Sequence, residues 1–152
     1  MNASVEVARE DVNFNYDFKI KDLKGNKLDF TQFKGKVVFL NLWATWCGPC
    51  RAEMPTIQKL YDKIGKDPNI EFVMLSIDKD DDLTKVIRYL KDKNYTFNGY
   101  MPTEYLSAQL NVPSIPTTFV ISKKGKILTK EVGTTNFNTH RFYEFLKAES
   151  EK

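Results

Sequence analysis

The chain has 152 residues, 41% of them hydrophobic and 13% aromatic, and it carries a formal net charge of +3. This length suits a single domain with a proper core, and the modest charge without a basic block argues against a nucleic-acid-binding protein. No apolar run approaches the roughly 20 residues needed to span a bilayer.

Strand and helix signals alternate from the N-terminus onward. We expect residues 1–13 to form a tail or loosely attached edge and residues 14–152 to form the folded domain. The segment 16–20 alternates polar and apolar residues, and 28–30 can pair back after a glycine-containing turn, which predicts an N-terminal β-hairpin. The run 37–43 is apolar on both faces and predicts a central strand covered by helices.

The middle of the chain continues this alternation. A helical pattern covers residues 49–64, with a proline in the first turn, where a missing N–H costs nothing. A second apolar strand is predicted at 70–77 and a helix at 82–92, whose acidic start favours the helix dipole. A short strand near 96–100 and a helix near 103–110 follow. Such an order is typical of α/β folds.

The last third of the chain predicts a hairpin and a closing helix. The strands 117–122 and 126–132 flank a lysine-rich tip, Lys123 to Lys126, which we interpret as a solvated turn. The closing helix spans roughly 138–149 and has apolar residues at helical spacing. The complete order predicts an α/β sandwich with a central mixed sheet and helices on both faces.

The most informative feature is the motif Trp46-Cys47-Gly48-Pro49-Cys50, which holds the only two cysteines of the chain. It follows a predicted strand, at the edge of the sheet where active sites are expected. A structural zinc site needs four ligands, and haem attachment needs a histidine directly after the second cysteine. A purely structural bridge over so short a loop would contribute little stability. The pair therefore indicates a redox-active dithiol.

The two cysteines are predicted to have different roles. Cys47 lies at a helix N-terminus, where unpaired N–H groups stabilise the thiolate, which is the attacking form of a thiol. Cys50, one turn later, should be more buried and should resolve the mixed disulfide. That second step requires a proton acceptor, and Glu53 is the candidate. The alternative interpretation of Glu53 is an ordinary exposed helix residue.

Three segments of the chain resemble the thioredoxin superfamily. The stretch 43–50 is similar to its active-site signature, 114–119 to its cis-proline loop, and Val132-Gly133 to the turn that lines its substrate groove. The resemblance covers roughly residues 14–149. It implies a thioredoxin-like three-layer sandwich with a central mixed β-sheet.

Further features resemble the TlpA/ResA-like branch of this superfamily. Asn41 stands where cytoplasmic thioredoxins carry a buried Asp, and Glu53 matches the buried Glu of the branch. The extra helix and strand near 82–100 match its central αβ insertion, and the N-terminal β-hairpin matches as well. The resemblance thus supports Glu53 as a functional residue.

The resemblance also implies how a substrate binds. A cis peptide bond before Pro116 would leave the Ile115 backbone free to pair with an extended substrate strand near Cys47. Trp46 is interpreted as the rim of the docking surface. The expected substrate-binding residues are Trp46, Gly48, Pro49, Ile115, Pro116 and Gly133.

The expected function is that of a protein-disulfide reductase that works through a Cys47/Cys50 dithiol–disulfide cycle without a metal or other cofactor. The Gly-Pro pair favours a reductant, since thioredoxin lies at about −270 mV and strong oxidants at about −120 mV. Three alternatives stay open: a thiol-disulfide oxidant or isomerase, a thiol peroxidase, and a non-catalytic docking domain of a larger envelope protein.

Partners and location follow from the resemblance alone. It implies a disulfide-containing protein as substrate, a membrane thiol transporter as upstream electron donor, and a monomer that binds no nucleic acid. It also implies an extracytoplasmic location, in the periplasm or cell envelope. The polar start of the chain lacks the apolar core of a signal peptide, which fits either a cytoplasmic protein or a mature or trimmed form. The resemblance favours the second, with a signal or anchor absent from this sequence.

Overall fold

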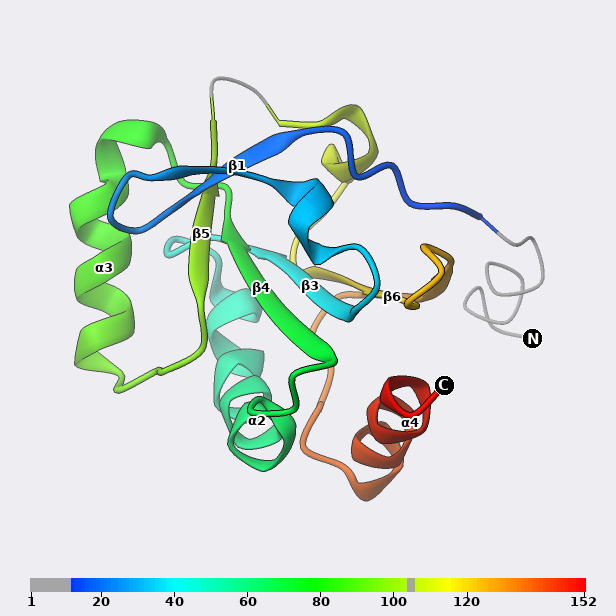
Figure 1. Ribbon diagram of the computed structural model, residues 1–152. Coiled ribbons are helices and arrows are strands. Elements are labelled where there is room, and N and C mark those ends of the chain that lie inside the picture. Colours follow the sequence, from blue (N-terminus) through cyan, green and yellow to red (C-terminus); the bar gives the residue numbers. More distant parts are fainter. Residues whose placement is uncertain (1–11, 104–105) are drawn as a thin grey trace.

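A computed structural model describes residues 12–103 and 106–152, which form an α/β sandwich around one mixed sheet (Figure 1). The strands are β1 (Lys19–Asp22), β2 (Lys27–Asp29), β3 (Val37–Trp43), β4 (Ile70–Ser76), β5 (Gly99–Pro102), β6 (Thr117–Ile121) and β7 (Ile127–Val132). The α-helices are α2 (Gly48–Ile64), α3 (Leu83–Asp92) and α4 (His140–Ser150), and the 3-10 helices are η1 (Phe30–Phe33), η2 (Asp80–Asp82) and η3 (Ala108–Leu110).

Within the described ranges the sheet has seven strands in the order β2-β1-β5-β4-β3-β6-β7. β3 is parallel to β4 and antiparallel to β6, and β5 continues the sheet parallel to β4. All seven residues of β3 are buried, as expected for a central strand with both faces covered. The carboxyl-terminal ends of β3 and β4 lie together at one end of the sheet, on the left in Figure 1.

Two core clusters lie on opposite faces of this sheet, because successive residues of a strand point to opposite sides. Phe39 and Trp43 belong to the cluster that includes residues of α2, α3 and α4. Val38 and Leu40 belong to the cluster that includes residues of the N-terminal segment, η1 and η3. The predicted α/β sandwich is confirmed, but 3-10 helices and extended chain cover the second face, where α-helices were expected.

Aromatic side chains explain why such short segments can cover the second face. The rings of Phe14, Phe18 and Phe30 lie with centroids 4.6 to 6.0 Å apart. Phe30 and Phe33 are both buried and meet edge to face across η1. Each large ring buries much apolar area, so a four-residue helix and an extended segment fill this layer.

The helix predicted near 103–110 is wrong for the described part of that segment. Residues 104–105 lie outside the described ranges, and of the remainder only η3 is helical. Gln109 accepts a hydrogen bond from Asn15 N at 3.0 Å and donates one to Asn15 O. The segment is therefore extended over the second face, where Leu110 is buried and Gln109 holds the N-terminal chain.

The predicted tail or edge at residues 1–13 lies largely outside the described ranges, which begin at residue 12. The described end pairs with the β6–β7 hairpin. Ile127 N donates a hydrogen bond to Val12 O at 2.8 Å, and Asn13 forms a β-bridge with Lys126. Residues 12 and 13 thus extend the sheet beyond the start of β7.

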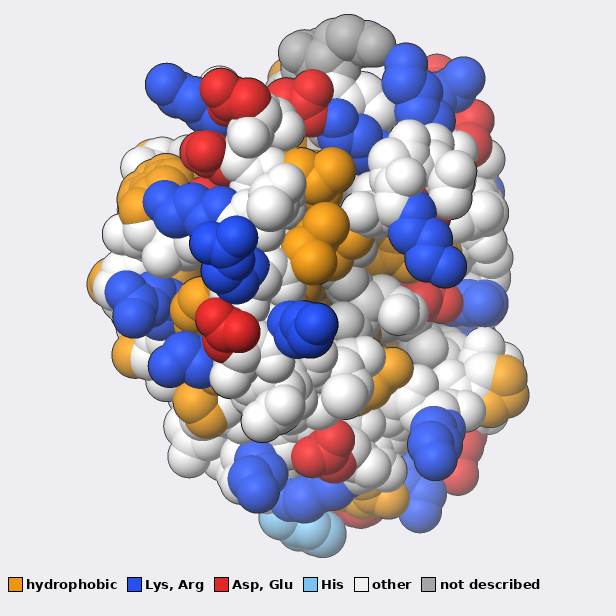
Figure 2. Space-filling view, turned by 90° about the vertical axis from the view of Figure 1, so that its left-hand side faces the viewer, with side chains coloured by type: hydrophobic (Ala, Val, Ile, Leu, Met, Phe, Trp, Pro, Cys, Tyr) orange, Lys and Arg blue, Asp and Glu red, His pale blue; other side chains and the backbone are white. Residues whose placement is uncertain are grey.

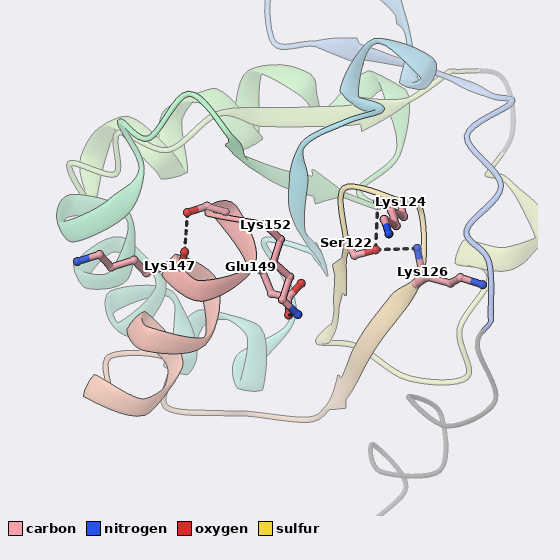
Figure 3. Close-up of polar contacts among 7 residues, drawn as sticks. Ser122, Lys124, Lys126, Lys147, Glu149 and Lys152 are labelled. Carbon is pink, nitrogen blue, oxygen red and sulfur yellow. Dashed lines mark hydrogen bonds and ion pairs between the residues drawn. The ribbon is translucent and has the colours of Figure 1, made fainter.

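Figure 3 shows the lysine-rich hairpin tip between β6 and β7 beside the end of α4. Ser122 Oγ accepts hydrogen bonds from the backbone N–H groups of Lys124 and Lys126, at 3.2 and 3.1 Å, which hold the turn. Lys123 Nζ donates to Ser150 O at 2.6 Å, at a helix C-terminus, where a cation is favoured. The tip therefore contacts the last helix through Lys123, while Lys124 is exposed to solvent.

Candidate active site

Cys47 immediately precedes the first turn of α2. Its backbone is extended, with φ −95° and ψ 108°, and its Sγ accepts a hydrogen bond from Cys50 N at 3.2 Å. β3 ends at Trp43, so the central strand delivers the cysteine to the end of the sheet. A sulfur in this position lies at the positive end of the helix dipole, which favours its thiolate.

Cys47 and Cys50 are joined by a disulfide, with their Cα atoms 5.3 Å apart. Cys47 is 6% exposed, whereas Cys50 is completely buried. Gly48 and Pro49, between them, are exposed. The sulfur of Cys47 is therefore the one that a second protein can approach.

The loop before β6 lies against this disulfide. The Ile115–Pro116 peptide bond is cis, and Ile115 O lies 3.8 Å from Cys47 Sγ. Gly133 N donates a hydrogen bond to Pro116 O at 2.8 Å. Gly133 adopts φ +87°, a conformation that suits glycine and strains other residues. The fold thus brings together three segments that are far apart in the sequence.

Two exposed apolar side chains flank these segments. Trp46, next to Cys47 in the chain, is 61% exposed, and Val132, next to Gly133, is 60% exposed. Thr134 Oγ1 donates a hydrogen bond to Pro49 O at 3.0 Å, which fastens the loop after β7 to the start of α2. Exposed apolar side chains around a reactive group are typical of docking surfaces.

Glu53 lies on the buried side of α2, and its side chain is 1% exposed. Its Oε2 accepts a hydrogen bond from Asn41 Nδ2 at 2.9 Å, and its Oε1 accepts one from Thr135 N at 3.1 Å. Residues three positions apart on a helix are neighbours on its surface. Glu53 and Cys50 therefore share one face of α2.

The pKa of the Glu53 carboxyl is raised from 4.5 to about 7, chiefly because burial removes the hydration of its charged form. The hydrogen bonds from Asn41 and Thr135 lower this pKa and so oppose part of the effect. A carboxyl group with a pKa near neutrality can both accept and release a proton at neutral pH. This property suits a group that exchanges protons with a thiol.

Asp78 is a buried carboxylate at the end of β4 that the sequence analysis missed. Its Oδ2 accepts hydrogen bonds from Thr45 N at 2.9 Å and Ser76 Oγ at 2.6 Å. Its Oδ1 accepts a hydrogen bond from Thr45 Oγ1 at 2.6 Å. These contacts hold the segment between β3 and Cys47. The available signal was a Ser-x-Asp sequence directly after an apolar strand, at the edge where functional side chains gather.

We expect Asp78→Ala to lower the free energy of unfolding by about 3 kcal/mol, because three buried donors would lose a charged acceptor. Asp78→Asn should cost about half as much, since one acceptor oxygen remains. Urea unfolding measures both changes. Asp81→Asn, in the exposed turn η2, is the matched control and should leave stability unchanged. If Asp78→Ala unfolded at the same urea concentration as the wild-type protein, these hydrogen bonds would not stabilise the fold.

The site contains the Cys47–Cys50 disulfide. Within the described ranges, no group of three or more His, Cys, Asp or Glu side chains is placed to hold a metal ion. In the same part of the chain, no helix combines the length and the apolar character needed to cross a bilayer.

Several known proteins are similar to this chain in sequence. The redoxin family model matches residues 12–144. The chain is 37% identical to thioredoxin-like protein YneN of Bacillus subtilis over 119 residues, which are 78% of this chain and 69% of YneN. It is 35% identical to thiol-disulfide oxidoreductase ResA of Bacillus thuringiensis over 129 residues, which are 85% of this chain and 71% of ResA.

The fold is also found among solved structures. The solution structure of a candidate protein disulfide isomerase from Bacteroides thetaiotaomicron superposes with a TM-score of 0.80 at 23% identity. The match covers 93% of this chain and 90% of that one. The chain therefore belongs to the redoxin family, in which it is a thiol-disulfide oxidoreductase with a thioredoxin-like fold, similar to ResA.

Proposed function

We propose that this oxidoreductase acts as a reductant of protein disulfides, with Cys47 as the attacking thiol and Cys50 as the resolving thiol. The observation that carries the proposal is the contrast between the two sulfurs. Cys47 precedes the first turn of α2 and is 6% exposed, whereas Cys50 is completely buried. The catalytic unit would be residues 14–152.

The cycle starts from the reduced pair. The Cys47 thiolate attacks one sulfur of the substrate disulfide, forms a mixed disulfide, and releases the other substrate sulfur as a thiolate that takes up a proton. Cys50, deprotonated, then attacks Cys47 Sγ, which releases the second substrate sulfur and closes the Cys47–Cys50 disulfide. Two electrons and two protons pass to the substrate, and an upstream dithiol must restore the reduced pair.

Glu53 would accept the proton of Cys50 in the second step. Three observations support this role: Glu53 lies on the same face of α2 as Cys50, its side chain is buried, and its pKa is about 7. At neutral pH a substantial fraction of such a carboxyl group is ionised and able to take a proton. Because Asn41 is neutral, its side-chain N–H positions the carboxylate without competing for that proton.

The substrate would bind as an extended strand beside Ile115, in a form of strand addition. Support comes from the cis bond before Pro116 and from the position of Ile115 O, 3.8 Å from Cys47 Sγ. Five further residues would line the same surface: Trp46, Gly48, Pro49, Pro116 and Gly133. Gly48 and Gly133 would let a partner strand approach the disulfide closely, and the exposed Trp46 would contact it from the rim.

The partners and the location belong to this proposal as well. The substrate would be a protein with an accessible disulfide, in keeping with the name thiol-disulfide oxidoreductase that ResA carries. The upstream donor would be a membrane thiol transporter, and the protein would act as a monomer in the cell envelope. It would need no cofactor beyond its own cysteines, and it would bind no nucleic acid.

Insulin reduction tests the proposed direction. With dithiothreitol as electron source, the protein should accelerate the precipitation of insulin B chains, and Cys47→Ser should abolish the acceleration. Equilibration with glutathione should give a reduction potential below about −200 mV, nearer thioredoxin than the strong oxidants. Acceleration with a potential near −120 mV would identify an oxidant, and no acceleration would identify a non-catalytic docking domain.

A further inference from the structure

An open groove of about 340 Å³ begins beside the active site and lies between α2 and α3. One wall comes from the first two turns of α2 and contains Gly48, Arg51 and Pro55. The other wall comes from α3 and the residues after it, with Tyr89 and Tyr95 among them. Figure 2 shows the side of the molecule that carries α3, where basic side chains lie beside apolar ones and acidic side chains are present as well.

The charge of this groove has one sign. Arg51 and Lys93 line it, and no acidic side chain does. Both basic residues are exposed, and among the described residues no carboxylate forms an ion pair with either of them. The Arg51 guanidinium lies 5.8 Å from the centre of the Tyr89 ring, which orients it by a cation–π contact.

Contacts with buried residues hold the aromatic wall of the groove in place. Tyr89 packs against the buried Trp43, with ring centroids 5.7 Å apart, and against Tyr95 at 6.2 Å. Tyr95 in turn stacks on the buried Phe97 at 5.2 Å. Next to Tyr95, Gln58 of α2 donates a hydrogen bond to Thr96 Oγ1 at 2.7 Å and accepts one from Thr96 N at 2.9 Å, which fastens the loop after α3 to α2. Both rings are therefore partly buried and fixed by the core, beside the two basic side chains.

The distance between the groove and the disulfide determines which residues of a bound partner the groove can contact. Arg51 follows Cys47 by four residues, which is about 6 Å along a helix axis. An extended chain advances about 3.3 Å per residue, so Arg51 lies about two residues away from a substrate sulfur bound at Cys47. A segment within the groove is consequently part of the same partner strand that brings the reacting cysteine.

We propose that this groove selects partner proteins that carry acidic side chains about two residues from the reacting cysteine. The carboxylates would pair with Arg51 and Lys93, and the adjoining part of the partner chain would lie on Tyr89 and Tyr95. This inference rests on the proposed reductase function and adds a substrate class to it. Complementary charge beside the disulfide also raises the rate of encounter with such partners.

Matched peptides test the proposal. Each peptide carries one cysteine in a mixed disulfide with thionitrobenzoate, whose release by the reduced protein is followed by absorbance. One peptide has aspartates two residues before and after the cysteine, and its twin has asparagines there. In this single-turnover assay we expect the second-order rate constant of thionitrobenzoate release to be about tenfold higher for the acidic peptide at low salt, and the preference to shrink in high salt.

Substitutions in and outside the groove show which residues cause the preference for the acidic peptide. The double variant Arg51→Gln/Lys93→Gln should reduce the acidic and neutral peptides at equal rates. The matched control is Lys91→Gln, which removes an exposed charge of α3 outside the groove and should keep the tenfold ratio. The ratio of the two rates, and not either rate alone, is the readout, because Arg51 lies close enough to Cys47 to influence its thiolate.

The outcomes separate this inference from the function on which it rests. If the wild-type protein reduces neither peptide, the proposed reductase function is wrong. If it reduces both peptides at equal rates, or if the double variant keeps the full preference for the acidic peptide, the reductase function stands but the groove does not select acidic partners. A preference that Lys91→Gln also removes would place the recognition on α3 as a whole and would overturn the assignment to the groove.

Discussion

Cys50→Ser should leave the protein covalently attached to its partners through Cys47, whereas Cys47→Ser should trap almost none. The serine variant can still form the mixed disulfide, but it has no second thiol to release it. The expected difference in trapped complex on non-reducing gels is about 100-fold, since the buried Cys50 cannot be reached by a second protein.

Alkylation of the reduced protein provides an independent check of the same assignment. Iodoacetamide at neutral pH should modify Cys47 first, because its position before α2 favours the thiolate. The double serine variant controls for non-specific complexes. Faster alkylation of Cys50, or equal trapping by both single variants, would reverse the order of attack proposed here.

Glu53→Gln should preserve the fold and slow the resolving step about 100-fold at neutral pH, the lower end of what general acid–base groups contribute. The wild-type rate should also rise between pH 6 and 8, as a carboxyl group with a pKa of about 7 loses its proton. The variant should lack this rise. Stopped-flow measurement of mixed-disulfide decay gives both rates, and Glu144→Gln on the exposed side of α4 is the control.

The same group makes stability depend on pH. Folding raises the pKa of Glu53 from 4.5 to about 7, so the folded protein holds this proton more tightly than the unfolded chain. Stability from this group is therefore complete below about pH 4.5 and falls by about 3 kcal/mol as pH rises to 7 and beyond. Glu53→Gln should remove this decline in urea titrations of the disulfide form. A decline of equal size in the variant would assign it to other groups.

The central elements could be predicted because their patterns admit few alternatives. The apolar run of β3 gave its bounds, and α2 starts at Gly48, one residue before the prediction. The position of Cys47 at the strand end and helix start follows directly from these two elements. The position of Ile115 against the disulfide could not come from local pattern, since it depends on the pairing of β3 with β6. It was expected only through the resemblance.

Other features depend on contacts that no periodicity encodes. Asp78 and Thr45 are far apart in sequence, and their hydrogen bonds exist only because β3 and β4 end side by side. The segment near 103–110 has helix-forming residues. In the structure, however, Gln109 bonds the N-terminal chain at Asn15 and Leu110 packs into the core on the second face of the sheet. In both cases tertiary contacts decided what the local sequence left open.

The two edges of the sheet bear on how this protein avoids pairing with itself. A protein that binds partners by strand addition is exposed to unwanted strand addition elsewhere. One edge strand, β2, has only three residues and carries Lys27 and Asp29. The other, β7, is capped at its start by the chain near Val12 and carries Lys130 and Glu131 farther on. Short length, charge and coverage all discourage strand pairing at these two edges, and they favour the proposed binding of a substrate strand at the loop beside the disulfide.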